Sequence, residues 1–133
     1  MVLTLPLGDK KLAGIGADDI GKGAYGIFKQ GPILASKTIG VAGRQFTGRE
    51  MATALTQALG QDVEYQDISL ETYRGLGFPG ADDLSNMFRF YQDFEPAVNA
   101  ARDVAAFKEL NPALRSLEEW LAENVPRIPL DKP

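Results

Sequence analysis

The most constraining feature of this chain is a strand–helix–strand pattern in its middle third. Residues 38–42 form a short apolar run that indicates a buried strand, and residues 63–68 indicate another strand. Between them, Thr47 and Glu50 form a capping-box pattern, and Gly60 is placed to end the helix that follows. Such a βαβ unit of about 30 residues is expected to have parallel strands and a right-handed connection. The pattern predicts an α/β fold with a small, mostly parallel sheet.

A glycine-rich helix is predicted before this unit. An extended segment over residues 2–7 comes first, and Asp18 is then placed to cap a helix over residues 19–30. Each glycine inside a helix costs about 1 kcal/mol relative to alanine, so this helix needs close packing against a neighbour. The glycines are Gly21, Gly23 and Gly26.

Helices are also predicted after the unit. Ser69 is placed to cap a short helix, and Asp82 or Asp83 to begin a longer one. Ser116 opens a second capping box. Residues 97–110 fit either a helix or a loop.

Length and composition indicate one globular domain over residues 1–133. The chain is 44% hydrophobic and 24% charged, which is ordinary for a folded protein. It contains no cysteine and no histidine, so disulfides, Cys/His zinc sites and a histidine base are excluded.

Charge and hydropathy bear on partners and location. The net charge is −4 and there is no long basic run, so direct nucleic-acid binding is not expected. No apolar stretch approaches the length of a membrane span, and the first residues do not follow a signal-peptide pattern. We therefore expect a cytoplasmic protein that does not bind membranes.

Residues 21–26 fit the glycine pattern G-x-G-x-x-G, which in dinucleotide-binding folds lets the backbone approach a pyrophosphate. Asp18 and Asp19 precede the glycines here, where a hydrophobic strand should end, and their charge opposes a phosphate. Phe46 stands where an acidic residue would bind the ribose. We interpret the glycines as helix-packing positions, with phosphate binding as the less favoured alternative.

Two further patterns that suggest catalysis have structural explanations. Tyr25 and Lys29 fit Tyr-x-x-x-Lys, but the serine used by short-chain reductases is missing, and we interpret the two as a helix-surface pair. Adjacent carboxylates recur at the predicted first turns of helices, where negative charge favours the helix dipole. These pairs are Asp18/Asp19, Asp82/Asp83 and Glu118/Glu119. We therefore predict no catalytic residues and no metal ligands.

Large apolar side chains around the longer C-terminal helix are the candidate ligand site. They follow one another too closely to share one helix face, so either both faces are covered or one face lines a pocket. The pocket candidates are Phe78, Met87, Phe90 and Tyr91.

Residues 75–91 join a Gly/Pro turn, an acidic helix start and this apolar stripe. Together with residues 110–112 and 117–121, this block resembles the C-terminal part of NmrA-like proteins, which are atypical short-chain dehydrogenases/reductases. The resemblance implies the substrate- or partner-facing half of an NAD(P)-binding, Rossmann-like fold, without the N-terminal nucleotide-binding half. NADP or NAD is therefore implied only by resemblance, and no cofactor-binding residue carries over to this chain.

The resemblance leaves two functions open. One is a non-catalytic binding or regulatory module, related to redox sensors that regulate transcription through protein partners. The other is the substrate-binding part of an NAD(P)H-dependent reductase whose cofactor half is missing or supplied by another chain. A carrier of a small apolar ligand is a third possibility. We expect the isolated chain to bind NADP(H) or NAD(H) no more tightly than roughly 100 μM.

Self-association is also expected. In the resembled fold, the βαβ segment and the glycine-rich helix pack against a larger sheet. Without it, Ile39, Val41 and the helix face formed by residues 21–26 would be uncovered, and parallel strands need cover on both faces. We predict a homodimer, or a partner protein that covers the exposed sheet.

Overall fold

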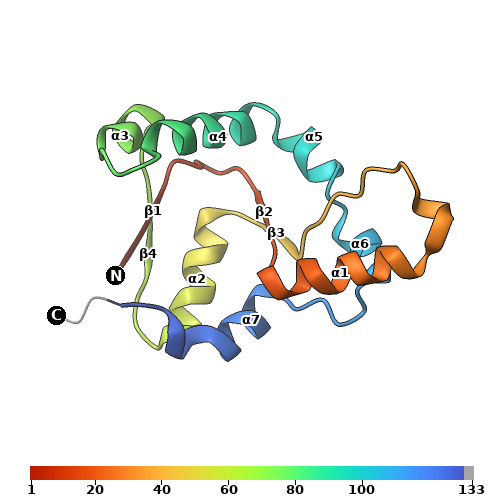
Figure 1. Ribbon diagram of the computed structural model, residues 1–133. Helices are drawn as coiled ribbons and strands as arrows, with labels where there is room; N and C mark the ends of the chain where they lie inside the picture. Colours follow the sequence, from red (N-terminus) through yellow and green to blue (C-terminus); the bar gives the residue numbers. More distant parts are fainter. Residues whose placement is uncertain (131–133) are drawn as a thin grey trace.

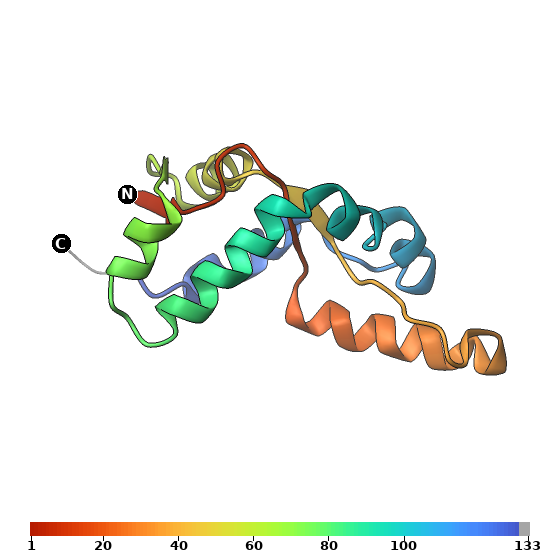
Figure 2. The same ribbon diagram turned by 90° about the horizontal axis from the view of Figure 1, so that it is seen from above.

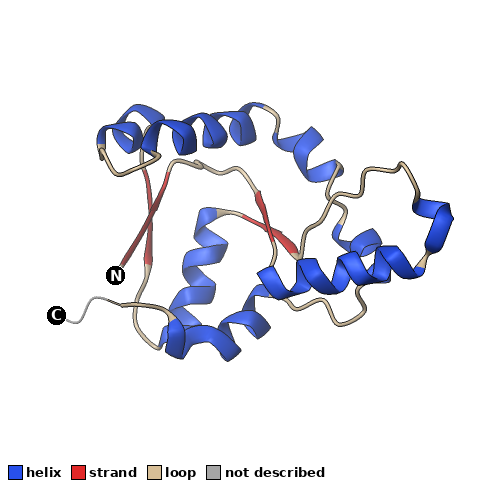
Figure 3. Ribbon diagram, in the orientation of Figure 1, coloured by secondary structure: helices blue, strands red, loops and turns tan. Residues whose placement is uncertain are grey.

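In the computed structural model, which describes residues 1–130, helices form most of the regular structure and four short strands form two separate sheets (Figure 1 and Figure 3). The strands are β1 (Val2–Leu5), β2 (Leu12–Gly14), β3 (Arg44–Phe46) and β4 (Glu64–Asp67). The α-helices are α1 (Ala17–Lys29), α2 (Gly48–Leu59), α3 (Leu70–Gly75), α4 (Ala81–Asp93), α5 (Glu95–Ala100), α6 (Val104–Leu110) and α7 (Leu117–Asn124). Two short 3₁₀ helices are η1 (Gly31–Leu34) and η2 (Val125–Arg127).

The first sheet pairs two strands that lie far apart in the sequence. β1 and β4 are parallel, with Val2 opposite Glu64 and Leu5 opposite Asp67. The second sheet, β2 with β3, is antiparallel. The expected α/β fold with a small parallel sheet and several helices is therefore confirmed. Within residues 1–130, no helix combines the length and the apolar composition needed to cross a bilayer.

The strand predicted at residues 38–42 is wrong. This apolar segment is a loop, and the next strand is β3, which pairs with β2. Gly40 lies so close to the backbone of Ala101 that a Cβ atom there would overlap the carbonyl group. The segment thus packs against the turn after α5 rather than joining a sheet. The predicted strand at 63–68 exists as β4, but its parallel partner is β1.

Local capping signals were confirmed. The side chain of Thr47 accepts a hydrogen bond from the Glu50 backbone N–H at 3.2 Å, and the Glu50 carboxylate accepts one from the Thr47 N–H at 2.8 Å. Gly60 ends α2 in the left-handed conformation, with φ 66°. Ser116 forms the second capping box, at the start of α7.

The predicted cap of α1 is wrong. Gly16, not Asp18, occupies the N-cap position, and no side chain caps the helix there. Asp18 lies exposed in the first turn, while Asp19 is buried and bonded to Arg115. The end of the helix was predicted correctly, because Gly31 follows with φ 62° and begins η1.

The C-terminal half is a series of helices. Ser69 caps α3 as predicted, whereas α4 begins after Gly80, with Asp82 and Asp83 in its first turn rather than at its cap. The undecided residues 97–110 contain the end of α5 and all of α6. Asp103 caps α6 by accepting hydrogen bonds from two backbone N–H groups at 2.8 and 3.1 Å.

Much of the apolar core lies where α3 and α4 cover the start of the chain. Leu7, Tyr73 and Phe88 form its centre, and the rings of Tyr73 and Phe88 meet edge to face at 5.4 Å. Figure 1 shows α3 and α4 running together along one side of the molecule. A second set of buried side chains, which includes Phe107, Leu114 and Leu121, belongs to α6, α7 and the segment between them.

Candidate ligand cavity

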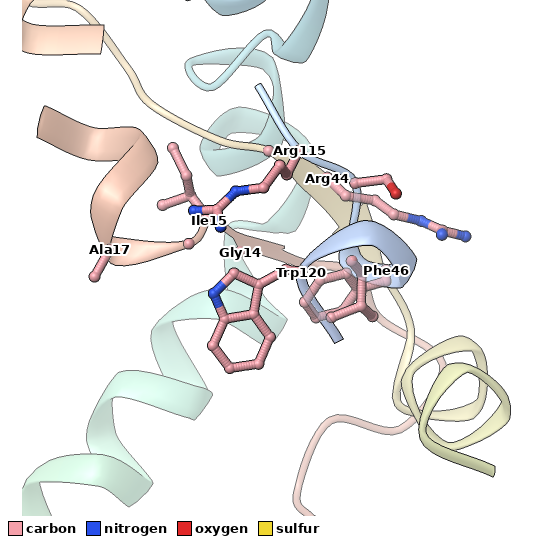
Figure 4. Close-up of a pocket in the computed structure, with 11 residues that line it drawn as sticks. Gly14, Ile15, Ala17, Arg44, Phe46, Arg115 and Trp120 are labelled. Carbon is pink, nitrogen blue, oxygen red and sulfur yellow. The ribbon is translucent and has the colours of Figure 1, made fainter. Parts of the chain in front are cut away.

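A cavity of about 260 Å³ lies where three distant segments of the chain meet. Residues 14–17 supply the turn from β2 into α1, residues 43, 44 and 46 supply the segment around β3, and residues 115–117 and 120 supply the start of α7. Figure 4 shows the side chains that converge there. The cavity is therefore a product of the tertiary fold, in which β2 pairs with β3 and α7 closes the open side.

One wall of the cavity is aromatic. A Cβ atom at Gly14 would lie 2.6 Å from Cζ of Phe46, and one at Gly16 would lie 2.9 Å from Cδ1 of Trp120. Both distances are too short for real carbon contacts, so glycine at these two positions lets the rings lie directly on the backbone. In Figure 4 the rings of Trp120 and Phe46 lie below the two arginine side chains. The indole N–H of Trp120 adds a hydrogen-bond donor to this wall.

A buried ion pair stabilises the opposite side. Nε of Arg115 lies 3.0 Å from Oδ2 of Asp19, whose side chain is almost completely buried. Nη1 of Arg115 lies 2.6 Å from Oε2 of Glu123, and Nζ of Lys22 lies 3.2 Å from Oδ1 of Asp19. The network therefore joins α1 to both ends of α7.

This network shifts the protonation equilibria of its members. Burial raises the pKa of Asp19, but hydrogen bonds from Arg115 and Lys22 outweigh burial, and the pKa lies below its ordinary value. Hydrogen bonds to Asp19 and Glu123 raise the pKa of Arg115. Both groups are therefore charged at neutral pH, and the pair remains intact.

The second arginine of the cavity is also paired. Arg44 forms an ion pair with Glu118 in the first turn of α7. A bond to its own backbone N–H, together with the bond from Arg44, lowers the pKa of Glu118. Arg115 also lies 3.7 Å from the exposed carboxylate of Asp18. Each cation at the cavity thus already has at least one carboxylate partner, and an anionic ligand would have to compete with these carboxylates.

Among the residues that line the cavity, the only hydroxyl group belongs to Ser116. The hydroxyl of Ser116 accepts a hydrogen bond from the Glu119 backbone N–H at 3.1 Å and serves as a helix cap. Within residues 1–130, no group of three histidine, cysteine, aspartate or glutamate side chains is placed to hold a metal ion. The arrangement offers an apolar surface, one indole donor and two guanidinium groups that have carboxylate partners, of which Arg115 keeps a buried Nη2 without a hydrogen bond to the described residues.

The four pocket candidates from the sequence lie elsewhere, on α4 and the turn before it. Phe78 and Met87 pack against the core formed by Leu7, Tyr73 and Phe88. Phe90 is half exposed, and its ring lies 6.0 Å from that of Tyr91. None of the four lines the cavity described here, and their role in ligand binding stays a prediction. The three segments that line the cavity share no local sequence motif, so the sequence alone does not predict that they come together.

Two of the three glycines in α1, Gly23 and Gly26, serve helix packing as interpreted from the sequence, whereas an added Cβ at Gly21 would meet nothing within 4 Å. A Cβ at Gly23 would enter the ring of Phe107, and one at Gly26 would overlap the carbonyl group of Leu110. α1 and α6 are therefore in backbone contact, and the face of α1 expected to be uncovered is covered by the chain itself. Tyr25 is 66% exposed, with Nζ of Lys29 5.6 Å from its ring centre, as expected of a surface pair.

Solved structures of similar fold include a nucleoside-diphosphate-sugar epimerase, reductases and a regulator. NmrA, a negative transcriptional regulator solved in complex with NADP, superposes with a TM-score of 0.73 at 19% identity, over 95% of this chain and 43% of that chain. Citrobacter sp. triphenylmethane reductase complexed with NADP(H) gives 0.73 at 17% identity, over 92% and 44%. Escherichia coli NADPH-dependent quinone oxidoreductase complexed with NADPH gives 0.62 at 22% identity, over 96% and 44%.

These similarities show the fold, and they show that the chain spans less than half the length of the proteins it matches. The family model of the NmrA-like family matches residues 1–121, which is most of the sequence. This match includes β1, the whole of α1 to α6 and the part of α7 that carries Trp120. The chain belongs to the NmrA-like family.

Proposed function

We propose that this chain is a non-catalytic NmrA-like binding module whose cavity receives a small, flat and uncharged ligand. The observation that carries the proposal is the composition of the cavity wall. Trp120 and Phe46 provide ring faces, whereas the only hydroxyl, that of Ser116, is engaged as a helix cap. A site of this kind can bind an aromatic molecule but has no group to transform it.

The charge around the cavity selects against anions. Arg115 is bonded to Asp19 and Glu123, and Arg44 to Glu118. These carboxylates already compensate the charge of both guanidinium groups, and Nη2 of Arg115, which is buried and forms no hydrogen bond within residues 1–130, can still donate to an oxygen atom of a ligand. An uncharged aromatic ligand with one hydrogen-bond acceptor fits better, since it can stack on the rings and accept from the indole N–H of Trp120.

Among the possible binding functions, the family resemblance favours a regulatory role. The related NmrA is a negative transcriptional regulator. By analogy, ligand occupancy here would alter the contacts of this chain with a protein partner, as part of a redox-sensing response in the cytoplasm. Direct DNA contact is not part of the proposal, because the net charge of −4 disfavours it.

The alternative is the substrate-binding part of an NAD(P)H-dependent reductase. Two solved structures of similar fold favour it, the Citrobacter triphenylmethane reductase and the E. coli quinone oxidoreductase. Each is more than twice the length that the superposition covers. In this alternative, the nucleotide-binding half would come from a longer form of the protein or from another chain, and the cavity would hold the organic substrate.

The single tryptophan gives a direct test of the cavity. Trp120 contributes the only indole N–H signal in a nitrogen-15 NMR spectrum, and it stands in the wall. We expect 2-acetylnaphthalene to shift this signal with a Kd below about 1 mM, or about −4 kcal/mol, and 2-naphthoate to bind at least tenfold more weakly. Leu117→Phe, which fills the cavity, should abolish the shift, whereas Ala122→Phe on the exposed side of α7 should not. An unchanged indole signal with both probes contradicts ligand binding at this site.

A calorimetric titration tests whether the isolated chain binds the cofactor. We expect NADPH and NADH to bind the isolated chain no more tightly than roughly 100 μM, about −5.5 kcal/mol. Low-micromolar binding of either would contradict the expectation, common to both functions, that this chain carries no cofactor site of its own. Co-purification with a nucleotide-binding chain, together with quinone-dependent oxidation of NADPH by that complex, would support the alternative in its two-chain form.

A further inference from the structure

Two of the three guanidinium nitrogens of Arg115 are bonded to carboxylates, and the third is not. Nε lies 3.0 Å from Oδ2 of Asp19, and Nη1 lies 2.6 Å from Oε2 of Glu123. Nη2 is buried and forms no hydrogen bond within residues 1–130. Leaving a buried donor unpaired costs free energy, so nearly all such groups in proteins meet an acceptor. The unpaired Nη2 therefore points to an acceptor that comes from a ligand.

Asp18, the carboxylate beside Nη2, does not supply this acceptor. Its Oδ2 atom lies 3.7 Å from Nη2, which is longer than a hydrogen bond, and its side chain is 82% exposed. Attraction between charges at such an exposed position is weakened by water. Arg115 lines the cavity, whereas Asp18 is not among the lining residues. Nη2 is thus left for a group that enters the cavity.

The two ion pairs of Arg115 hold Nη2 in a fixed direction. Asp19 is on α1 and Glu123 is near the end of α7, and Figure 1 and Figure 2 both show the start of α7 beside the start of α1. Because the guanidinium group is planar and two of its nitrogens are bonded, the direction of the third is set. Nη2 is therefore a preorganised donor, and a ligand that bonds to it loses little affinity to the ordering of this side chain.

The ring of Trp120 lies close to the same cluster. At the point where a Cβ atom of Gly16 would lie, Nε1 of Trp120 is 3.3 Å away and Oδ2 of Asp19 is 3.4 Å away. Figure 4 shows the guanidinium group of Arg115 and the ring nitrogen of Trp120 near the turn that carries Ile15. A carbonyl oxygen has two lone pairs, so one such atom of a stacked ligand can accept from Nη2 and from the indole N–H.

The charges of the cluster determine which kind of acceptor fits. Arg115 and Lys22 are positive, and Asp19 and Glu123 are negative and pair with them. These four charges compensate one another, and an anionic ligand would add a further negative charge beside the carboxylates. A neutral carbonyl oxygen gains a charge-assisted hydrogen bond without that repulsion. The cluster therefore favours an aromatic ketone, ester or amide over an aromatic carboxylate.

We propose that Arg115 is the specificity-determining residue of the cavity, and that Nη2 donates a hydrogen bond to a neutral carbonyl oxygen of an aromatic ligand. This inference rests on the proposed function, in which the same cavity holds a flat, uncharged molecule. Trp120 and Phe46 bind the faces of the ligand, whereas Arg115 selects the carbonyl group at its edge. Because Nη2 is buried within the described residues, the inference depends on no exposed face.

Two probes of nearly equal shape test this selection. 2-Acetylnaphthalene carries a carbonyl oxygen, and 2-isopropenylnaphthalene has a methylene group in its place. Each is titrated against the indole N–H signal of Trp120, with the same low fraction of dimethyl sulfoxide. We expect the ketone to bind the wild type at least about tenfold more tightly than the hydrocarbon, because its acceptor meets a charged donor.

Arg115→Lys is the variant that removes Nη2. Lysine keeps a positive charge for Asp19 but has no second nitrogen to reach the ligand. The preference for the ketone should fall at least about tenfold, while the Kd of the hydrocarbon stays within about threefold of the wild-type value. A purely structural role of Arg115 would weaken both probes equally, and that result overturns the inference.

Asp18→Asn is the matched control, because it removes the charge of the other group near Nη2. It should change the preference for the ketone less than about threefold, as expected of an exposed pair. A rise of about tenfold or more would show that the Asp18 carboxylate occupies Nη2 in the wild type, and would overturn the inference. Equal binding of the two probes to the wild type overturns this inference alone. An unchanged indole signal with both probes overturns the proposed function as well.

A measurement on the wild type gives a result even where Arg115→Lys does not fold. The Nη2 protons of Arg115 should exchange with water at least about threefold more slowly with the ketone bound than with the hydrocarbon bound, because only the ketone offers them an acceptor. Proton-exchange NMR on nitrogen-15-labelled arginine measures both rates. Equal rates with the two probes bound overturn the inference.

Discussion

The guanidinium group of Arg115 lies 3.0 Å from the carboxylate of Asp19, although the two residues are separated by most of the chain. This contact connects the first turn of α1 to the residue that precedes the cap of α7, and it forms one side of the ligand cavity. A buried pair contributes little compared with an apolar pair of the same shape, but the loss of one partner leaves the other charge without compensation.

Asp19→Ala should therefore lower the free energy of unfolding by about 3 kcal/mol, because Arg115 loses its buried partner. Urea denaturation followed by the fluorescence of Trp120 measures the change. Asp18→Ala is the control. Its carboxylate is exposed and lies 3.7 Å from Arg115, so the loss should stay below about 1 kcal/mol. Equal losses in the two variants would contradict the assigned role of Asp19.

The same pair predicts how stability depends on pH. The pKa of Asp19 is lower in the folded protein than in the unfolded chain, where it is about 3.9. The unfolded state therefore binds more protons in this window, and the stabilisation is present above about pH 4 and is lost as the pH falls through the folded pKa. The free energy of unfolding should fall more steeply between pH 5 and 3 in the wild type than in Asp19→Asn. A residual slope is expected from Glu50 and Glu118, whose pKa values are also lowered.

Two alanine substitutions in α1 should have opposite effects. Gly21→Ala should stabilise the protein by about 1 kcal/mol, because alanine is the better helix former and its Cβ meets nothing within 4 Å. Gly26→Ala should destabilise it by about 1–3 kcal/mol, because its Cβ would overlap the Leu110 carbonyl. Thermal unfolding of both variants at low micromolar concentration compares them. Two variants of equal stability would show that α1 and α6 are not in backbone contact.

Tyr25→Phe should leave any activity of the protein nearly unchanged. The Tyr25 side chain is 66% exposed, and its partner Lys29 contacts the ring face rather than the hydroxyl. Steady-state turnover with NADPH and a quinone, in whatever complex shows activity, is the measurement. A loss of roughly 100-fold or more, the lower range for an acid–base group, would restore the reductase interpretation of this pair.

Local sequence signals predicted the helices well, because the interactions that begin and end a helix join residues only a few positions apart. The two capping boxes at Thr47 and Ser116 each need only the side chains three positions apart, and both formed. The strand expected at residues 38–42 did not form, because strand formation depends on contacts with residues that are distant in the sequence. An apolar run becomes a strand only beside another strand, and here Gly40 lies against the turn that follows α5. Nothing near residue 40 in the sequence carries that information.

The cavity illustrates the same limit. Phe46 and Trp120 were visible as aromatic residues beside the capping boxes, but their convergence depends on Gly14 and Gly16 accepting the rings. The sequence pattern instead favours a pocket at the dense aromatic segment that includes Phe78 and Met87, two residues that pack against the core. The family resemblance was correct because it rested on the order of several motifs along the chain, rather than on where any one side chain points.

The parallel pairing of β1 with β4 affects how the chain reaches its native state. The contact between Val2 and Glu64 closes a loop of the chain that contains both β2 and β3. Contacts of such long sequence separation slow the search for the native topology, since closure entropy must be overcome before any pairing energy is gained. α1 and α2 lie inside this loop and can form from local contacts, whereas the sheet of β1 and β4 forms only when the loop closes.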